Sequence, residues 1–233
     1  MDIKNIKTEF PIFQQKIKDK PLVYLDSANS SQKPKQVIDR LSSFYQTEYS
    51  NIGRSVHSLA VKATNRFEET RDIVKNYINA KHREEIIFTK GATESINLVA
   101  SSFGESFINK DDEIIVSELE HHSNYVPWHF LRKKKGAIIK FAQVNINGEI
   151  EIDEIKKLIT NKTKIIAITH LSNVTGAIVP IKKIVDLVKS KNIAVLVDGT
   201  QGAPHLQINM QELGCDFYAI SCHKMYGPNG LGI

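Results

Sequence analysis

Short runs of apolar and β-branched residues alternate along the middle of the chain with stretches in which apolar residues recur every three or four positions. The run Ile193–Val197 is continuously apolar, which is typical of a strand that is buried on both faces of a parallel sheet. Ile152–Ile159 and Ile181–Val188 have the helical period instead. Strands separated by helix-length segments predict an α/β domain with a mainly parallel sheet. The expected strands are Ile86–Thr89, Glu113–Ser117, Ala137–Ala142, Lys164–Thr169, Ile193–Val197 and Phe217–Ile220.

A different pattern precedes this block. Apolar residues at helical spacing predict helices within residues 36–79, including a long amphipathic helix over Ala60–Ile78. Before them, Leu22–Leu25 is expected to form a short strand that leads into a polar turn. We therefore expect an N-terminal segment of strand, turn and helices over residues 1–80, and a larger α/β domain over residues 81–233.

The last residues, Gly230–Ile233, are mostly apolar and resemble the entrance to a further strand. Chain ends are more often polar and free to fray. This pattern predicts that the domain is incomplete and continues beyond Ile233.

Composition and charge narrow the class of protein. The 233 residues are 41% hydrophobic and 24% charged, which is ordinary for a soluble globular protein. We expect a cytoplasmic protein, because the N-terminus lacks the apolar core of a secretory signal and no apolar run approaches the ~20 residues of a membrane span.

The net charge is +5, but the densest basic cluster, Arg132–Lys135, has the pattern of a solvated helix end, so no nucleic-acid partner is expected. Cys215 and Cys222 fit neither a disulfide framework nor a zinc spacing.

Two polar side chains follow neighbouring expected strands. Asp198 directly follows Val197, and Lys224 lies four residues beyond Ile220. The carboxyl ends of strands in an α/β sheet form the crevice in which ligands bind. Taken alone, Asp198 is more simply a helix cap and Lys224 a solvated lysine. Together they are the pair that a pyridoxal-phosphate (PLP) enzyme needs, because a lysine forms a Schiff base and an acid keeps the pyridine nitrogen protonated.

Two further segments lie just beyond expected strands. Gly91–Ser95 opens a helical stretch, where small residues let backbone N–H groups approach a phosphate, although an ordinary N-cap at Thr93 or Thr89 explains the pattern as well. Glu120–Asn124 contains a pair of histidines, and a histidine there can stack on a heteroaromatic ring and exchange protons near neutral pH. No metal is expected, because no cysteine or acid cluster completes a zinc spacing around the pair. The glycines near the end have the order G-x-x-G-x-G, which reverses the dinucleotide-binding fingerprint.

Six strings of residues occur in the order that one known family shows. They are Asp26–Ala28, Gly91–Ser95, Glu120–Trp128, Ser172–Gly176, Val197–Gln201 and Ser221–Pro228. With them the chain resembles the class-V aminotransferase superfamily, and within it the SufS-type cysteine desulfurases and their selenocysteine-lyase relatives. The resemblance covers nearly all of the chain, and the strings at 120 and 221 are its most specific parts. It implies fold type I of the PLP-dependent transferases, an α/β fold with a mainly parallel sheet flanked by helices, and places the small C-terminal domain beyond Ile233.

The resemblance also implies a role for each matching residue. Lys224 forms the Schiff base and later moves a proton between the substrate Cα and the cofactor. His121 stacks on the ring and is placed for acid–base work. Asp198 pairs with the pyridine nitrogen, and Gln201 bonds to the phenolic oxygen. The other implied cofactor-binding residues are Ala92, Thr93, Asn173, Ser221 and His223, and the implied substrate-side residues are Ala28, His57 and Asn173.

The activity implied by the resemblance is conversion of L-cysteine to L-alanine and an enzyme-bound persulfide, which supplies iron–sulfur cluster assembly through a sulfur-acceptor protein. The full-length enzyme would be a homodimer, with its nucleophilic cysteine and carboxylate-binding arginine beyond Ile233. Cys222 stands where relatives usually have a small residue, and it is not expected to be the nucleophile. A selenocysteine lyase, a cysteine-sulfinate desulfinase or another class-V enzyme uses the same cofactor residues. A noncatalytic fragment that binds PLP or a partner protein is an alternative outside enzymology.

Overall fold

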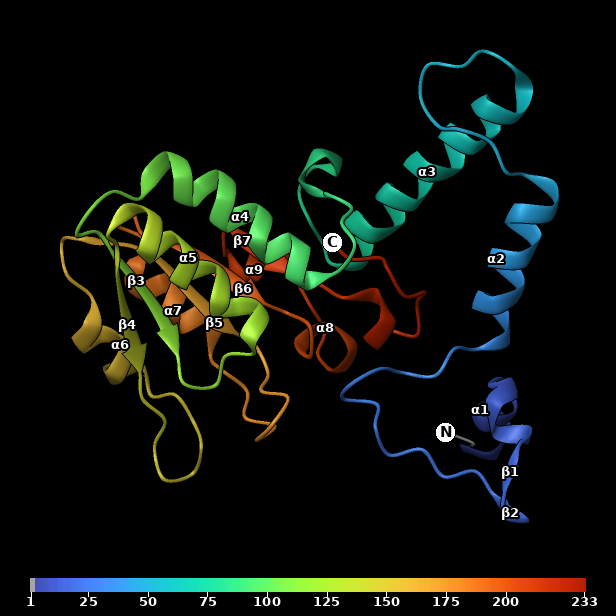
Figure 1. Ribbon diagram of the computed structural model, residues 1–233, viewed down its shortest axis with the longest axis horizontal. Coiled ribbons are helices and arrows are strands. Elements are labelled where there is room, and N and C mark those ends of the chain that lie inside the picture. The colour runs from blue at the N-terminus through green and yellow to red at the C-terminus, as the bar shows by residue number, and fades with distance from the viewer. Residues whose placement is uncertain (1–2) are drawn as a thin grey trace. The chain divides into compact units, whose positions relative to one another are not determined.

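The structure is a computed structural model that describes residues 3–233, apart from the side chain of Lys4. The chain folds into two compact units (Figure 1). The larger unit consists of Ile87–Ser221 and Gly230–Ile233. The smaller unit consists of the residues up to Ile86 together with Cys222–Asn229. The units therefore do not follow chain order, because the segment that contains Lys224 belongs with the N-terminal residues.

The larger unit is built on a five-stranded sheet with the strand order β4-β3-β5-β6-β7. Every neighbouring pair in this sheet is parallel, which confirms the predicted α/β architecture. In the register, Asp198 lies opposite Thr169 on one side and Ala219 on the other, so the carboxyl ends of three strands meet. The strands are β3 (Glu113–Ser117), β4 (Ile138–Ala142), β5 (Thr163–Thr169), β6 (Ala194–Asp198) and β7 (Phe217–Ala219).

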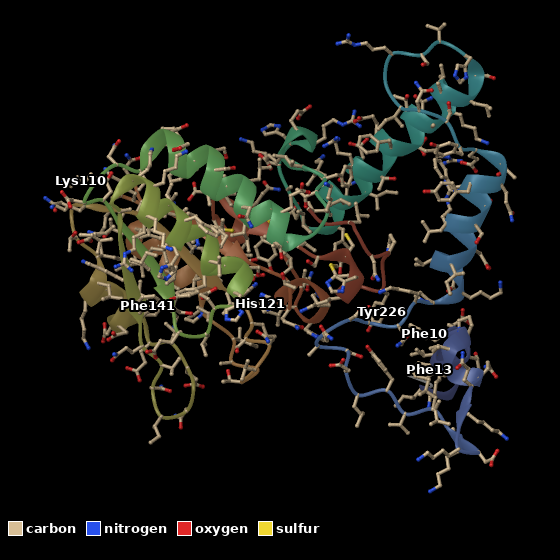
Figure 2. The ribbon with its side chains drawn as sticks, viewed as in Figure 1. Phe10, Phe13, Lys110, His121, Phe141 and Tyr226 are labelled. Carbon is tan, nitrogen blue, oxygen red and sulfur yellow. The ribbon has the colours of Figure 1, made fainter. Side chains whose placement is uncertain are left out.

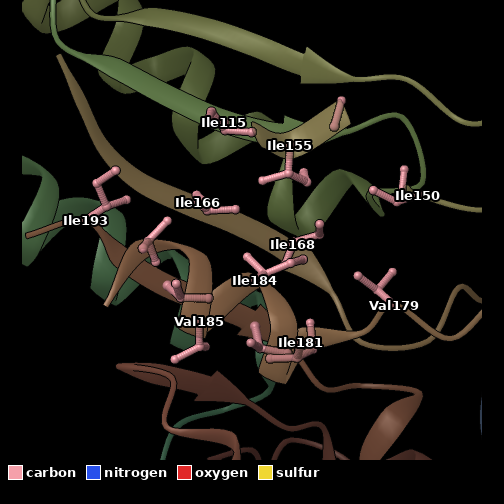
Figure 3. Close-up of a cluster of buried hydrophobic side chains, with 14 residues drawn as sticks. Ile115, Ile150, Ile155, Ile166, Ile168, Val179, Ile181, Ile184, Val185 and Ile193 are labelled. Carbon is pink, nitrogen blue, oxygen red and sulfur yellow. The ribbon is translucent and has the colours of Figure 1, made fainter. Parts of the chain in front are cut away.

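Helices cover both faces of the sheet (Figure 1). Alternate residues of each central strand point to opposite faces, so Ile166 packs with α6 and α7 while Ile165 packs with α4 and α5. Figure 3 shows the first of these two clusters. Each fully buried isoleucine contributes roughly 2 kcal/mol from water exclusion, which explains why the apolar runs became the central strands. The helices are α4 (Ala92–Phe107), α5 (Val126–Lys135), α6 (Ile152–Leu158), α7 (Ile181–Val188), α8 (Gly202–His205) and α9 (Met210–Leu213).

Two predicted strands are wrong. Ile86–Thr89 has no strand, because only Thr89 exchanges backbone hydrogen bonds with a neighbour, Gly232. Leu22–Leu25 forms no strand; Leu22 donates its N–H to the Gln15 carbonyl at 3.2 Å, and the nearby strand pair is instead β1 (Lys16–Ile17) with β2 (Lys20–Pro21). Apolar character makes a segment suitable for a sheet, but a strand exists only where another strand satisfies its backbone groups.

The smaller unit joins the N-terminal residues to the segment 222–229. The ring of Phe10 packs edge-on against Tyr226 at 5.8 Å and lies near Phe13 (Figure 2). The hydroxyl of Ser31 accepts from the backbone N–H of Tyr226 at 2.8 Å. None of the helices within residues 3–233 combines the length and the apolar character needed to cross a membrane. The elements are α1 (Ile3–Thr8), η1 (Pro11–Gln14), β1, β2, α2 (Lys35–Thr47), α3 (Ser58–Tyr77), η2 (Arg83–Glu85) and η4 (Cys222–Lys224).

Candidate active site

The start of α4 is hydrogen-bonded in the larger unit to Ser221, the second residue after β7. The backbone N–H of Ala92 donates to the hydroxyl oxygen of Ser221 at 2.9 Å. Gly91 precedes the helix with φ 154°, a conformation that favours glycine. A Cβ on Gly232 would lie 2.4 Å from the Gly91 Cα, so two backbones approach closely here. The exposed Thr93 stands in the first turn of the helix, where N–H groups lack helical acceptors and favour an anion.

Asp198 and Gln201 lie in one buried turn at the end of β6. They are 4% and 5% exposed. The Asp198 carboxylate accepts from the Thr200 N–H at 3.0 Å, and its backbone carbonyl accepts from the His170 N–H at 2.9 Å. The following helix α8 has Gln201, not Asp198, at its N-cap position. The helix-capping alternative for Asp198 is therefore wrong.

The side chain of Tyr218 in β7 packs against Gly199 and Gly202 in this turn. A Cβ on Gly199 would lie 1.9 Å from the Tyr218 ring, and a Cβ on Gly202 would lie 2.8 Å from its hydroxyl. The Tyr218 hydroxyl bonds to Nδ1 of His170 at 2.8 Å. Burial, with the nearby Cys215 thiol and Asp198 carboxylate, raises the pKa of Tyr218 above its ordinary value. Because the glycines admit this ring, the turn that holds Asp198 and Gln201 has little freedom to move.

His121 is exposed just beyond β3 (Figure 2). It is the N-cap of the short helix η3 (His122–Asn124), and its Nδ1 accepts from the Ser123 N–H at 3.1 Å. In the neutral ring this bond places the proton on Nε2. The structure thus leaves Nε2 of His121 as the nitrogen that can exchange a proton with a ligand.

Glu120, the residue before His121, has the most strongly displaced pKa of the carboxyl groups at this sheet edge. Burial raises its pKa to about 8 and the Asp198 charge adds to the rise, while bonds from Ser117, Asn124 and Thr169 oppose it. Sequence reasoning assigned Glu120 no function. The signal that could have drawn attention to it was an acid next to the candidate histidine at the end of an apolar strand.

Asn173 lies in a different turn of the larger unit. It is exposed in the turn that follows β5. The neighbouring Ser172 hydroxyl orders the turn, because it accepts from the N–H groups of Val174 and Thr175 at 3.2 Å each. Asn173 therefore lies beyond the end of β5, on the same edge as the groups that follow β3, β6 and β7.

The smaller unit contains His223 and Lys224, in η4. The His223 carbonyl accepts from the Ser31 hydroxyl at 2.9 Å and from Lys33 Nζ at 2.8 Å. Burial and the charges of Lys224 and Lys33 lower the pKa of His223. Ser221, the last residue of the larger unit before this segment, is followed directly by Cys222 in the chain.

The two candidate substrate residues also belong to the smaller unit. Ala28 is exposed in the polar turn of residues 27–29. His57 is the exposed N-cap of α3, where its Nδ1 accepts from the Ala60 N–H at 3.3 Å. The structure thus gives His57 a definite structural role at the helix start.

The groups of the larger unit fit the needs of PLP. The first turn of α4, with the hydroxyls of Thr93 and Ser221, offers donors to a phosphate. Asp198 is a buried acid at a neighbouring strand end, which suits a pyridine nitrogen that must stay protonated. Among residues 3–233, no three His, Cys, Asp or Glu side chains gather as metal ligands.

Known proteins resemble the chain over its whole length. A probable cysteine desulfurase of Halalkalibacterium halodurans is 46% identical over 233 residues, and the chain spans 57% of that protein. The crystal structure of the cysteine desulfurase CsdA from Escherichia coli superposes with a TM-score of 0.89 at 37% identity, covering 100% of this chain and 57% of that one. The apo cysteine desulfurase of Thermococcus onnurineus NA1 gives a TM-score of 0.91 at 33% identity, covering 99% and 56%.

The match to a protein family is equally extensive. Residues 23–233 match the family described as Aminotransferase class-V. They include the start of α4, the turn after β6 and the segment that contains Lys224. The chain therefore belongs to the aminotransferase class-V family.

Proposed function

We propose that the protein to which this sequence belongs is a PLP-dependent cysteine desulfurase of the SufS type. The observation that supports it most is the convergence at one sheet edge of the buried Asp198 and the bonded pair Ala92–Ser221. The first group suits a pyridine nitrogen and the second a phosphate. Similarity to proteins named cysteine desulfurase supports the choice of substrate.

PLP, when bound, supplies the electron sink that allows bonds at the substrate Cα to break. Asp198 would keep a proton on the pyridine nitrogen, and Gln201 would bond to the phenolic oxygen. Ser221 would donate its hydroxyl proton to the phosphate, since its oxygen already accepts from Ala92. Thr93, the N–H groups of α4 and His223 would complete the phosphate site.

The remaining candidates act toward the substrate. Lys224 would hold the cofactor covalently and move a proton to and from the substrate Cα. His121 would lie against the ring and exchange a proton through Nε2, because Nδ1 is occupied by Ser123. Ala28, His57 and Asn173 would line the substrate side.

The overall reaction breaks the Cβ–Sγ bond of L-cysteine. The released sulfur forms an S–S bond with an enzyme thiol, and the methyl group of L-alanine gains a proton. We propose that this persulfide passes to a sulfur-acceptor protein for iron–sulfur cluster assembly, and that the enzyme is a cytoplasmic homodimer.

Covalent labelling tests the cofactor assignment. The PLP-loaded protein is reduced with borohydride, digested and mapped, and the label is expected on Lys224. The variant Lys224→Ala should lose the label, whereas Lys162→Ala, an exposed lysine before β5, should retain it. A label on another lysine would contradict the assignment.

The substrate is tested on the same protein with L-cysteine, L-selenocysteine and L-cysteine sulfinate in parallel. The proposal expects sustained formation of L-alanine from L-cysteine, together with a protein-bound persulfide. Alanine from the sulfinate with none from L-cysteine would show a desulfinase instead.

A further inference from the structure

We propose that Glu120 is a positioning residue, whose carboxyl group fixes the turn of His121 to the ends of β3 and β5 and so sets the orientation of the imidazole. The proposal rests on the function proposed above, because it concerns how His121 is presented to the cofactor ring.

The carboxyl group of Glu120 joins three separate elements. Its Oε1 accepts from the Ser117 hydroxyl at 2.5 Å and from the Thr169 N–H at 2.9 Å. Ser117 and Thr169 are the last residues of β3 and β5, which are neighbours in the sheet. Its Oε2 accepts from Asn124 Nδ2 at 2.6 Å, in the helix η3. One side chain therefore ties both strand ends to the turn that follows β3.

The orientation of Asn124 is fixed from the core. Its side chain is fully buried, and its Oδ1 accepts from the indole N–H of Trp128 at 3.2 Å. Because the indole nitrogen is only a donor, this bond turns Nδ2 of Asn124 toward Glu120. The carboxyl group must therefore present an acceptor on that side.

His121 lies between these two anchored residues. Its carbonyl accepts from the Asn124 N–H at 2.8 Å, and its ring is held by Ser123. A shift of Asn124 therefore shifts both the backbone of His121 and the helix that it caps. The ring itself is exposed, so packing contributes little to holding it, and its orientation depends on Ser123 and on the turn that the Glu120 bonds hold in place.

The surroundings of Glu120 favour an acid without charge. Asp198 is the charged group that acts on it, and it lies at the end of β6, opposite Thr169. With a pKa of about 8, the Glu120 carboxyl group is mostly protonated at pH 7, and its proton then goes to the Ser117 hydroxyl, which can accept as well as donate, while Thr169 and Asn124 donate to the carboxyl oxygens. A glutamine side chain has nearly the same shape as the protonated Glu120 side chain and is also uncharged. It would still place an NH₂ group against either Asn124 Nδ2 or the Thr169 N–H, because both are donors.

The test compares Glu120→Gln with Glu118→Gln in the PLP-loaded protein. Glu118 lies in the same turn, is exposed, and accepts from the Val144 N–H, so it is a matched control. The readouts are the induced circular dichroism of bound PLP, the borohydride label on Lys224, and kcat and KM for L-cysteine. His121→Ala gives the reference signal for a ring without its stacking partner.

We expect Glu120→Gln to keep the Lys224 label, to shift the dichroism toward that of His121→Ala, and to lower kcat by about tenfold or more with little change in KM. Glu118→Gln should match the wild type. Wild-type dichroism and kcat in Glu120→Gln would overturn the proposal. Absence of the Lys224 label in the wild type would instead refute the cofactor assignment, so the two failures are distinguishable.

Ser117→Ala provides a second route if Glu120→Gln does not fold. It removes one of the three bonds and leaves the carboxyl group in place. We expect a partial shift of the dichroism in the same direction, and an unchanged signal would count against Glu120 as the restraint on His121.

Discussion

At the scale of single residues, Asp198 places a buried acid at the carboxyl end of β6. It is 4% exposed, and its Oδ1 accepts from Thr200. Burial of a charge is costly unless the charge is paired or fully hydrogen-bonded. In the proposed function, a protonated pyridine nitrogen would pair with this buried acid.

Asp198→Asn is predicted to reduce turnover far more than cofactor affinity. The amide still bonds to the ring nitrogen but stabilises its positive charge poorly, so the barrier should rise by several kcal/mol, with each ~1.4 kcal/mol being tenfold in rate. The measurement compares kcat with the dissociation constant of PLP. Asp186→Asn, an exposed acid of α7, is the control, and near-normal turnover in the Asp198 variant would exclude the pairing role.

Cys222→Ala is predicted to leave alanine formation from L-cysteine largely intact. Burial raises the pKa of the Cys222 thiol, which disfavours the nucleophilic thiolate. Its carbonyl also accepts from the N–H groups of Met225 and Gly227 at 2.9 Å each, so the residue is part of a tight turn. A persulfide carrier needs freedom to meet its acceptor. The initial rate of alanine release in the full protein checks this, and its abolition would make Cys222 the nucleophile.

At the scale of elements, the link between β3 and β5 through Glu120 predicts a dependence of stability on pH. The pKa of Glu120 rises from 4.5 to about 8 on folding. Between these values the folded state binds more protons than the unfolded state, so the free energy of unfolding falls as pH rises. The contribution is fully present below the lower value and is lost by about pH 8, and it amounts to a few kcal/mol.

Urea unfolding across this pH range measures the effect. The wild type should lose stability relative to Glu120→Gln as pH rises, because glutamine does not ionise. Glu118→Gln should follow the wild type. Parallel pH profiles for the wild type and the Glu120 variant would show that the carboxyl group ionises normally in the folded protein.

The elements of the sheet were predictable where burial alone decides them. Glu113–Ser117 and Ile181–Val188 have the predicted bounds, because continuous apolar runs and helical spacing report the faces they bury. The strand predicted at Ile86–Thr89 does not form, because a strand also depends on a partner. The residue that pairs with Thr89 is Gly232, 143 positions later in the chain. The bond from Thr169 to Glu120 is also non-local, because its partners are 49 positions apart in the chain, so no local pattern indicates it.

At the scale of the whole molecule, residues that are far apart in the chain belong to the same compact unit. The strings around Asp198 and Lys224 were recognised together from the sequence, yet Lys224 lies in a segment that packs with Ser30, Ser31 and Phe10. Serines and a phenylalanine near the N-terminus have many possible neighbours, and their partners follow from the tertiary fold only. The candidate residues were predicted by resemblance, while their division between two units was not.

The 233-residue chain made by itself is predicted to bind PLP weakly. It should not sustain desulfuration. Neither of its two thiols is placed as a nucleophile. Burial raises the pKa of Cys215 to about 12, so its thiol stays protonated at pH 7 and is a poor nucleophile. Cys215 also precedes β7, at the amino end of the strands, whereas Asp198 and Ser221 stand at the carboxyl end. Cys222 is disfavoured as a nucleophile by burial of its thiol and by the tight turn that contains it.

The measurement adds PLP and excess L-cysteine to the chain and follows alanine over time, with free PLP and the Cys215→Ala/Cys222→Ala double variant as controls. A small initial release at most is expected. Continued release well above that of free PLP, abolished in the double variant, would show that Cys215 or Cys222 accepts the sulfur and would overturn the prediction.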